Sequence, residues 1–127
     1  MKPNQDTIRA LLIEHNPFLL EGLYKLLSES AEMEVAGVAG SGAAGLALFE
    51  QIRPSVTILD LELPDLPAEE IVRRIRKIDP RTPVLILATY ELDPAGAAAI
   101  EAGASTVIAK DQIGVVLLSL IHSLCGR

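Results

Sequence analysis

The sequence has few of the residues that small secreted proteins and metal-stapled domains use to hold their folds. Its 127 residues include one cysteine, no tryptophan and only 3% aromatic residues. The single cysteine, Cys125, excludes an internal disulfide framework and a cysteine-based zinc site, and it fits a reducing compartment. Because aromatic rings are so scarce, the core must be built from aliphatic side chains.

Long hydrophobic runs and an excess of basic charge are missing as well. No apolar run reaches the roughly 18 residues that indicate a membrane-spanning helix, and residues 1–6 lack the apolar segment of a signal peptide. The net charge of −6 and the pI of about 4.8 disfavour direct binding of DNA or RNA, which needs a basic surface. We therefore expect a cytoplasmic protein that contacts neither membranes nor nucleic acids directly.

Half of the residues are hydrophobic, and they occur in short blocks separated by longer mixed segments. The blocks are continuously apolar, which favours strands that are buried on both faces of a sheet. Strands are predicted at residues 8–13, 35–38, 56–59, 84–87 and 106–109, and helices at 17–30, 43–52, 68–78, 94–101 and 113–124.

Five alternations of strand and helix predict a single α/β domain over residues 1–127. The expected fold is a doubly wound, five-stranded parallel sheet flanked by five helices, with the flavodoxin-like strand order 2-1-3-4-5. Aspartates support the helix boundaries: Asp65 and Asp93 are expected to cap the third and fourth helices, and Asp111 is expected to cap the last helix.

In an open parallel sheet, ligands and reactive groups gather at the carboxyl ends of the strands. Three charged residues fall there although they are far apart in sequence. Glu14 follows the first strand, Asp60 follows the third and Lys110 follows the fifth. The topology therefore predicts that two acids and a lysine meet at one rim of the sheet.

Three segments of the chain resemble a response-regulator receiver domain. They are residues 8–17 with 20–23, the stretch Ile-Leu-Asp-Leu-Glu-Leu-Pro at 58–64, and Ala-Gly-Ala at 102–104 followed by Ile-Ala-Lys-Asp at 108–111. The likeness covers essentially the whole chain and is greatest to receivers that precede a helix-turn-helix output domain. It implies a two-component signalling module rather than an enzyme, with a histidine kinase as partner and a C-terminal DNA-binding output domain outside this chain.

The resemblance implies roles for individual residues. Asp60 falls on the aspartate that accepts a phosphoryl group from the kinase, and Lys110 falls on the lysine that contacts the phosphoryl oxygens. Glu14, Asp60 and the backbone carbonyl of Glu62 fall on ligands of Mg²⁺. Cations are needed at such a site because the incoming phosphoryl group is negatively charged. Lys110 is also open to a structural interpretation, as the partner of Asp60 in an ion pair.

Three positions depart from the family's pattern. His15 stands where a second acid usually binds the metal, and imidazole is a poor ligand for Mg²⁺. Ala88 replaces the hydroxyl residue that bonds the phosphoryl group, and Val107 replaces the aromatic switch residue. The next residue after Ala88, Thr89, is expected to point the other way because side chains alternate along a strand. These losses favour an alternative, a degenerate receiver that acts as a phosphorylation-independent interaction or dimerisation module.

Aliphatic residues are also predicted on the surface of the last helix. Val115 and Leu118 are expected to point outward, near Phe18 and Leu19 of the first helix. Such a patch suits a symmetric homodimer or a contact with a partner protein.

Two other interpretations are disfavoured. For His15, a hydrogen-bonded rim residue is favoured over a transition-metal ligand or a pH sensor. A ligand-binding or hydrolytic α/β domain is disfavoured because the sequence has neither a Gly-rich phosphate loop after the first strand nor a G-x-S-x-G turn.

Overall fold

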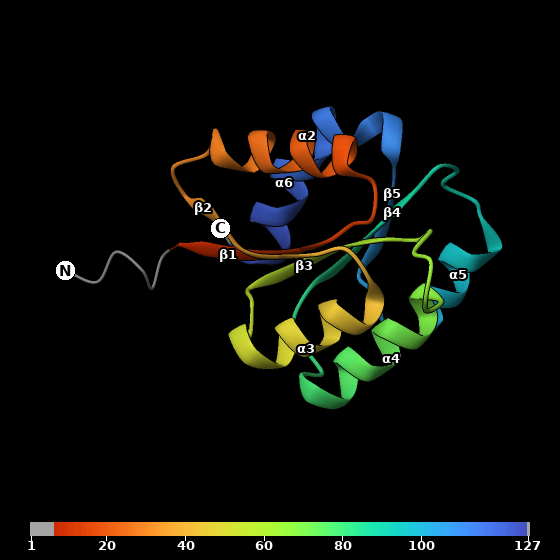
Figure 1. The fold of residues 1–127 in the computed structure, drawn as a ribbon. Helices are drawn as coiled ribbons and strands as arrows, with labels where there is room; N and C mark the ends of the chain where they lie inside the picture. The colour runs from red at the N-terminus through yellow and green to blue at the C-terminus, as the bar shows by residue number, and fades with distance from the viewer. Residues whose placement is uncertain (1–6, 127) are drawn as a thin grey trace.

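The computed structural model describes residues 7–126, in which a five-stranded sheet lies between two layers of helices (Figure 1). The strands are β1 (Ile8–Ile13), β2 (Met33–Ala39), β3 (Val56–Asp60), β4 (Val84–Ala88) and β5 (Thr106–Ala109). The helices are α2 (Pro17–Ser28), α3 (Gly42–Ile52), α4 (Ala68–Ile78), α5 (Pro94–Glu101) and α6 (Ile113–Leu124), and a short 3₁₀ helix, η1 (Lys110–Gln112), leads into α6.

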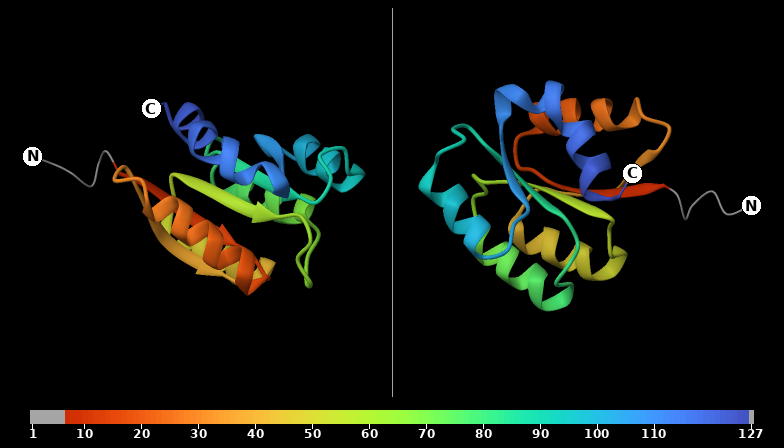
Figure 2. Two further views of the ribbon diagram at one scale, coloured as in Figure 1. Left: turned by 90° about the horizontal axis from the view of Figure 1, so that it is seen from above. Right: turned by 180° about the vertical axis from the view of Figure 1, so that it is seen from behind.

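The strands are all parallel and follow the order β2-β1-β3-β4-β5. Helices α2 and α6 cover one face of the sheet, and α3, α4 and α5 cover the other (Figures 1 and 2). The predicted fold class and strand order are therefore confirmed. Strand β2 is longer than the predicted 35–38 because it pairs with the whole of β1, from Ile8 opposite Met33 to Ile13 opposite Ala39.

The sheet separates two aliphatic cores, as the shortage of aromatic residues predicts. One core packs β-strand side chains against α2 and α6, and the other packs them against α3, α4 and α5. Phe49 is the one aromatic ring buried among residues 7–126. Every residue of β3 and β4 is buried, so these central strands hold their carboxyl ends in fixed positions. No helix within residues 7–126 is long and apolar enough to cross a bilayer.

Of the three helix caps predicted for aspartates, only one is confirmed. Asp93 caps α5 as predicted, with its side chain accepting a hydrogen bond from the Ala95 N–H. Asp111 does not cap α6, because η1 intervenes and the N-cap residue is Gln112. Asp65 does not cap α4 either, since the loop after β3 folds over the start of α3 instead. There the Asp65 carboxylate accepts hydrogen bonds from the N–H groups of Gly42 and Ala43 at 2.8 and 2.9 Å.

Replacing Asp65 with asparagine is expected to destabilise the protein in a pH-dependent way. The hydrogen bonds from Ala43 and Gly42 lower the pKa of Asp65 from its ordinary value of 3.8. A carboxyl whose pKa is lower in the folded state stabilises the fold above its unfolded value. The stabilisation is lost as the pH falls through the folded value. Urea unfolding should therefore show wild type more stable than Asp65→Asn at neutral pH, with the difference shrinking below pH 3.8. A difference that stays constant across that range would contradict this assignment.

Candidate functional site

The three charged residues predicted to meet do lie together at the carboxyl ends of the strands. Glu14 follows β1, Asp60 is the last residue of β3, and Lys110 follows β5 at the start of η1. The Lys110 side chain extends past the end of β4, which lies between β3 and β5. Its Nζ atom lies 2.9 Å from Asp60 Oδ2. The parallel topology alone thus brings together groups that are far apart in the sequence.

Asp60 is a buried carboxylate in a polar setting, with 1% of its surface exposed. Its Oδ1 atom accepts a hydrogen bond of 2.7 Å from the Glu62 N–H, and its Oδ2 atom pairs with Lys110. Burial by itself raises the pKa of Asp60, but the neighbouring Glu14 carboxyl group, the Glu62 N–H and Lys110 outweigh burial and lower it. Asp60 therefore carries a negative charge at neutral pH.

Glu14 is the second buried acid of the site. Burial and the neighbouring Asp60 carboxyl group raise the pKa of Glu14 from 4.5 to about 7, against the opposing effect of the Asn16 N–H. Oε2 accepts that N–H at 2.9 Å, whereas Oε1 is buried and has no hydrogen-bond partner. Two adjacent buried carboxyl groups repel each other when both are ionised, so one of them tends to keep a proton. Because the pKa of Glu14 is raised and that of Asp60 is lowered, Glu14 holds its proton to a higher pH than Asp60 does.

Lys110 supplies the positive charge of the site. Burial lowers the pKa of its ammonium group, but the hydrogen bond and the charge of Asp60 raise the pKa by more, so the net shift is upward. The same Nζ atom lies 3.5 Å from Glu62 Oε1. Lys110 is thus a fixed cation beside Asp60, as both interpretations of this residue require.

The oxygen atoms at this site suit a hard divalent cation. Residues 7–126 contain no cluster of three or more His, Cys, Asp or Glu side chains arranged to hold a metal. Mg²⁺ does not need one, because it is usually held by one or two carboxylates together with water and substrate phosphates. Glu14 and Asp60 supply two such carboxyl groups, and Glu14 Oε1 is a buried oxygen without a partner. His15 is exposed on the rim.

The predicted orientation of Thr89 is wrong. Ala88 is the last residue of β4 and is fully buried, so strand alternation ends before Thr89. The Thr89 hydroxyl turns toward the site and donates a hydrogen bond of 2.7 Å to Glu62 Oε1. Sequence reasoning assigned only the backbone of Glu62 to the site, and it missed both of these side chains. Thr89 lies one residue beyond the end of β4, and Glu62 lies two residues beyond the end of β3. These positions near the strand ends were the available signal.

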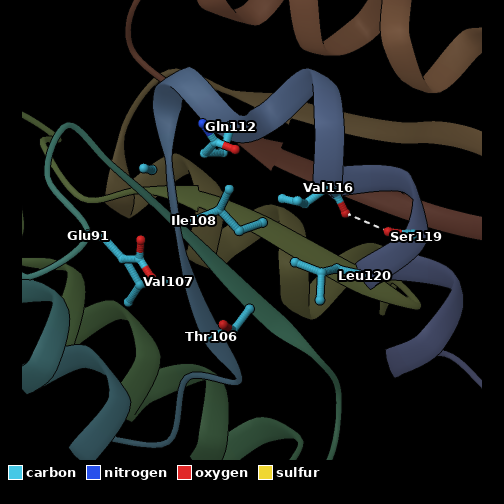
Figure 3. Close-up of a pocket in the computed structure, with 9 residues that line it drawn as sticks. Glu91, Thr106, Val107, Ile108, Gln112, Val116, Ser119 and Leu120 are labelled. Carbon is cyan, nitrogen blue, oxygen red and sulfur yellow. Dashed lines mark hydrogen bonds between the residues drawn. The ribbon is translucent and has the colours of Figure 1, made fainter.

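Val107 lies on the edge strand β5, next to a pocket and to helix α5. Figure 3 shows Val107 beside Glu91, on the side of β5 opposite to Ile108, which faces Val116 of α6. These residues line a pocket of about 420 Å³ between β5 and α6. On its own side Val107 faces α5, where a Cβ atom on Gly96 would lie 3.4 Å from it. Valine has no ring that could swing between inward and outward positions.

The predicted apolar patch on α2 and α6 is smaller than expected. These helices lie side by side on one face of the sheet (Figure 1). Phe18 is 85% exposed and Val115 is 77% exposed. Leu19 and Leu118 are half-buried and pack against the core beneath the helices, so the outward orientation predicted for Leu118 is wrong. Of the four residues predicted for the patch, only Phe18 and Val115 are exposed, one from each helix.

Comparison with known proteins gives consistent matches over nearly the whole chain. A family model for the response regulator receiver domain matches residues 10–122. The DNA-binding transcriptional activator DevR/DosR of Mycobacterium tuberculosis is 36% identical over 121 residues, which cover 94% of this chain and 56% of that protein. The crystal structure of a LuxR-family two-component response regulator from Aurantimonas sp. matches with a TM-score of 0.87 and 28% identity, and the match covers 95% of this chain and 87% of that one.

The chain spans about half the length of the curated transcriptional regulators that it matches, between 55% and 56% for three of them. It also matches a protein-glutamate methylesterase/protein-glutamine glutaminase of Desulfitobacterium hafniense, at 32% identity over 116 residues. That match covers 90% of this chain but only 29% of the methylesterase. The shared part is thus a module found in proteins of different overall activity.

Proposed function

Since the chain belongs to the response regulator receiver domain family, we propose that Asp60 accepts a phosphoryl group from a histidine kinase. One observation carries this proposal. Asp60 is a buried carboxylate whose pKa is lowered, and a lysine ammonium group lies 2.9 Å from it. A nucleophile must be ionised, and the transferred group needs a fixed cation beside it. Both conditions are present at the carboxyl end of β3.

The reaction that we propose is a transfer from a phosphohistidine of the kinase to Asp60. A carboxylate oxygen of Asp60 attacks phosphorus, and the P–N bond breaks as the new P–O bond forms. The departing imidazole keeps the electron pair of that bond and takes up a proton. Lys110 stabilises the negative charge on the phosphoryl oxygens, and the Glu62 N–H holds the Asp60 side chain in place at 2.7 Å.

Mg²⁺ is the cofactor that we propose for this site. Glu14, Asp60 and the backbone carbonyl of Glu62 would hold it, and when bound it neutralises charge on the phosphoryl oxygens. The buried Glu14 Oε1 atom without a hydrogen-bond partner supports this assignment. His15 is exposed and is not one of the proposed ligands.

The proposal is tested by incubating the protein with acetyl phosphate, in the presence and absence of Mg²⁺, and following its intact mass. Wild type should gain one phosphoryl group in a Mg²⁺-dependent manner, and Asp60→Asn should gain none. A well-characterised receiver labelled in parallel provides the positive control. If wild type stays unlabelled while that control is labelled, the alternative holds, and the chain is a degenerate receiver that works through protein contacts.

The proposed partners follow from the same family. We propose that this receiver acts together with a C-terminal DNA-binding output domain, which the half-length match to transcriptional regulators supports. We also propose that Phe18 and Val115 contribute to a homodimer contact across α2 and α6, since both are large, apolar and exposed.

A further inference from the structure

The Glu62 side chain is exposed and engages two donors, one of which also pairs with Asp60. Glu62 Oε1 accepts a hydrogen bond of 2.7 Å from the Thr89 hydroxyl and lies 3.5 Å from Lys110 Nζ. Lys110 in turn lies 2.9 Å from Asp60 Oδ2. A chain of short contacts therefore runs from Thr89 through Glu62 and Lys110 to the buried acid.

The Glu62 carboxylate resembles a phosphoryl group in charge and in partners. Both are anionic oxygen acceptors, and a phosphoryl group on Asp60 would lie beside the same ammonium group. Asp60 is deeply buried, with 2% of its side chain exposed, whereas 61% of the Glu62 side chain is exposed. The Glu62 carboxylate can therefore move into water at little cost, while Asp60 cannot move.

Thr89 provides a hydroxyl that the neighbouring residue lacks. Ala88 ends β4 and carries a methyl group, which cannot donate a hydrogen bond. Thr89 is exposed, lies just beyond the strand, and already directs its hydroxyl to an anion beside Lys110. Because it lies outside the strand, its side chain is not confined by the packing of the sheet.

We propose that Glu62 is a place-holder for the phosphoryl group, and that Thr89 is the hydroxyl donor of this receiver. In the unphosphorylated protein the Glu62 carboxylate holds Thr89 and Lys110. Phosphorylation of Asp60 brings a more highly charged acceptor, which repels Glu62 and takes over both donors. This inference rests on the proposed function, because it concerns the residues that receive the phosphoryl group.

The exchange has a consequence for the loop that Thr89 begins. Residues 89–93 join β4 to α5 and expose Tyr90 and Leu92. Glu91 of the same loop lines the pocket beside Val107 (Figure 3). When Thr89 changes partner, the surface formed by this loop changes with it. This change does not require an aromatic side chain at the position of Val107.

The test compares Thr89→Val, Thr89→Ser and Glu62→Gln in the full chain, with acetyl phosphate and Mg²⁺, by following the intact mass over time. Loss of a hydrogen bond to a charged group should slow labelling of Thr89→Val about tenfold, and Thr89→Ser should restore it to about the wild-type rate. Glu62→Gln removes the competing charge but keeps an acceptor for Thr89, so labelling should become about threefold faster.

A second readout reports on the loop rather than on the chemistry. The chain has two tyrosines and no tryptophan, so Tyr24→Phe leaves Tyr90 as the sole source of tyrosine fluorescence. In this background, phosphorylation should change the emission of Tyr90 when position 89 carries a hydroxyl group. The change is therefore expected with the native threonine and with Thr89→Ser, but not with Thr89→Val.

The outcomes separate this inference from the proposed function. If wild type and Thr89→Val are labelled at the same rate, the Thr89 hydroxyl does not contact the phosphoryl group. The inference is then wrong, while Asp60 remains the acceptor. If Glu62→Gln is labelled more slowly than wild type, Glu62 assists the reaction instead of competing with the phosphoryl group, and its role as a place-holder is wrong. If wild type is not labelled at all, the proposed function fails and the inference fails with it.

Discussion

Replacing Lys110 with methionine is expected to slow the labelling of Asp60 by acetyl phosphate about 100-fold, the usual effect of removing one fixed stabilising group from a transition state. Two effects act in the same direction. The phosphoryl oxygens lose the ammonium group, which lies 2.9 Å from Asp60 Oδ2. Asp60 also loses one of the partners that lower its pKa, so less of it is ionised. The rate is measured by intact mass at a fixed concentration of donor.

This experiment decides between the two interpretations of Lys110. A purely structural ion pair predicts lower stability for Lys110→Met, with an unchanged labelling rate for the folded protein. Urea unfolding of the same sample supplies the folded fraction, and Lys110→Arg keeps the positive charge while changing its geometry. A labelling rate within about twofold of wild type, after correction for unfolded protein, would contradict a role of about 100-fold for Lys110 in phosphoryl transfer.

Replacing Gly45 with alanine is expected to lower the free energy of unfolding by about 1–2 kcal/mol, because overpacking a rigid core costs about 2–3 kcal/mol and helix propensity offsets part of that cost. Gly45 lies in α3 where that helix approaches β1. A Cβ atom at this position would lie 2.5 to 2.9 Å from three side-chain carbons of Ile13, which is fully buried. Alanine gains about 1 kcal/mol of helix propensity over glycine, which is less than the cost of this contact. Chemical denaturation measures the net change.

Two control variants test the cause of that loss. Gly22 lies in α2 with open space around its Cα, so Gly22→Ala should raise stability by about 1 kcal/mol through propensity alone. Ile13→Val removes the Cδ1 atom nearest to the new methyl group. The double variant Ile13→Val/Gly45→Ala should therefore be less destabilised than the sum of the single changes. Additive losses would show that the steric explanation is wrong.

The fold could be predicted because its signals are local and repeated. The continuous apolar blocks and the helical segments between them identify the strands of a parallel sheet. The parallel topology then brings Glu14, Asp60 and Lys110 to one rim. The strand-length blocks could not show where hydrogen bonding would extend β2 at both ends, since that depends on pairing with β1. Asp65 was assigned to the wrong helix because its partners at the start of α3 lie more than 20 residues earlier in the chain.

The site was predicted less completely than the fold. The strand-end residues were found because the backbone direction determines their positions. The side chains of Thr89 and Glu62 lie beyond the strand ends, where the alternation rule no longer applies, and only the folded loops bring them to within 2.7 Å of each other. The raised pKa of Glu14 was also inaccessible, because it depends on burial and on contact with Asp60 rather than on residue type.

We propose Asp60 as the residue that becomes phosphorylated. The most direct test is to treat the labelled wild-type protein with borohydride, which reduces an acyl phosphate to an alcohol, and to map the product by peptide mass spectrometry. If Asp60 is the acceptor, the aspartate at position 60 alone is converted to homoserine. Conversion of another carboxyl group, such as that of Glu14, or no conversion in a sample that carries the phosphoryl mass, would contradict it.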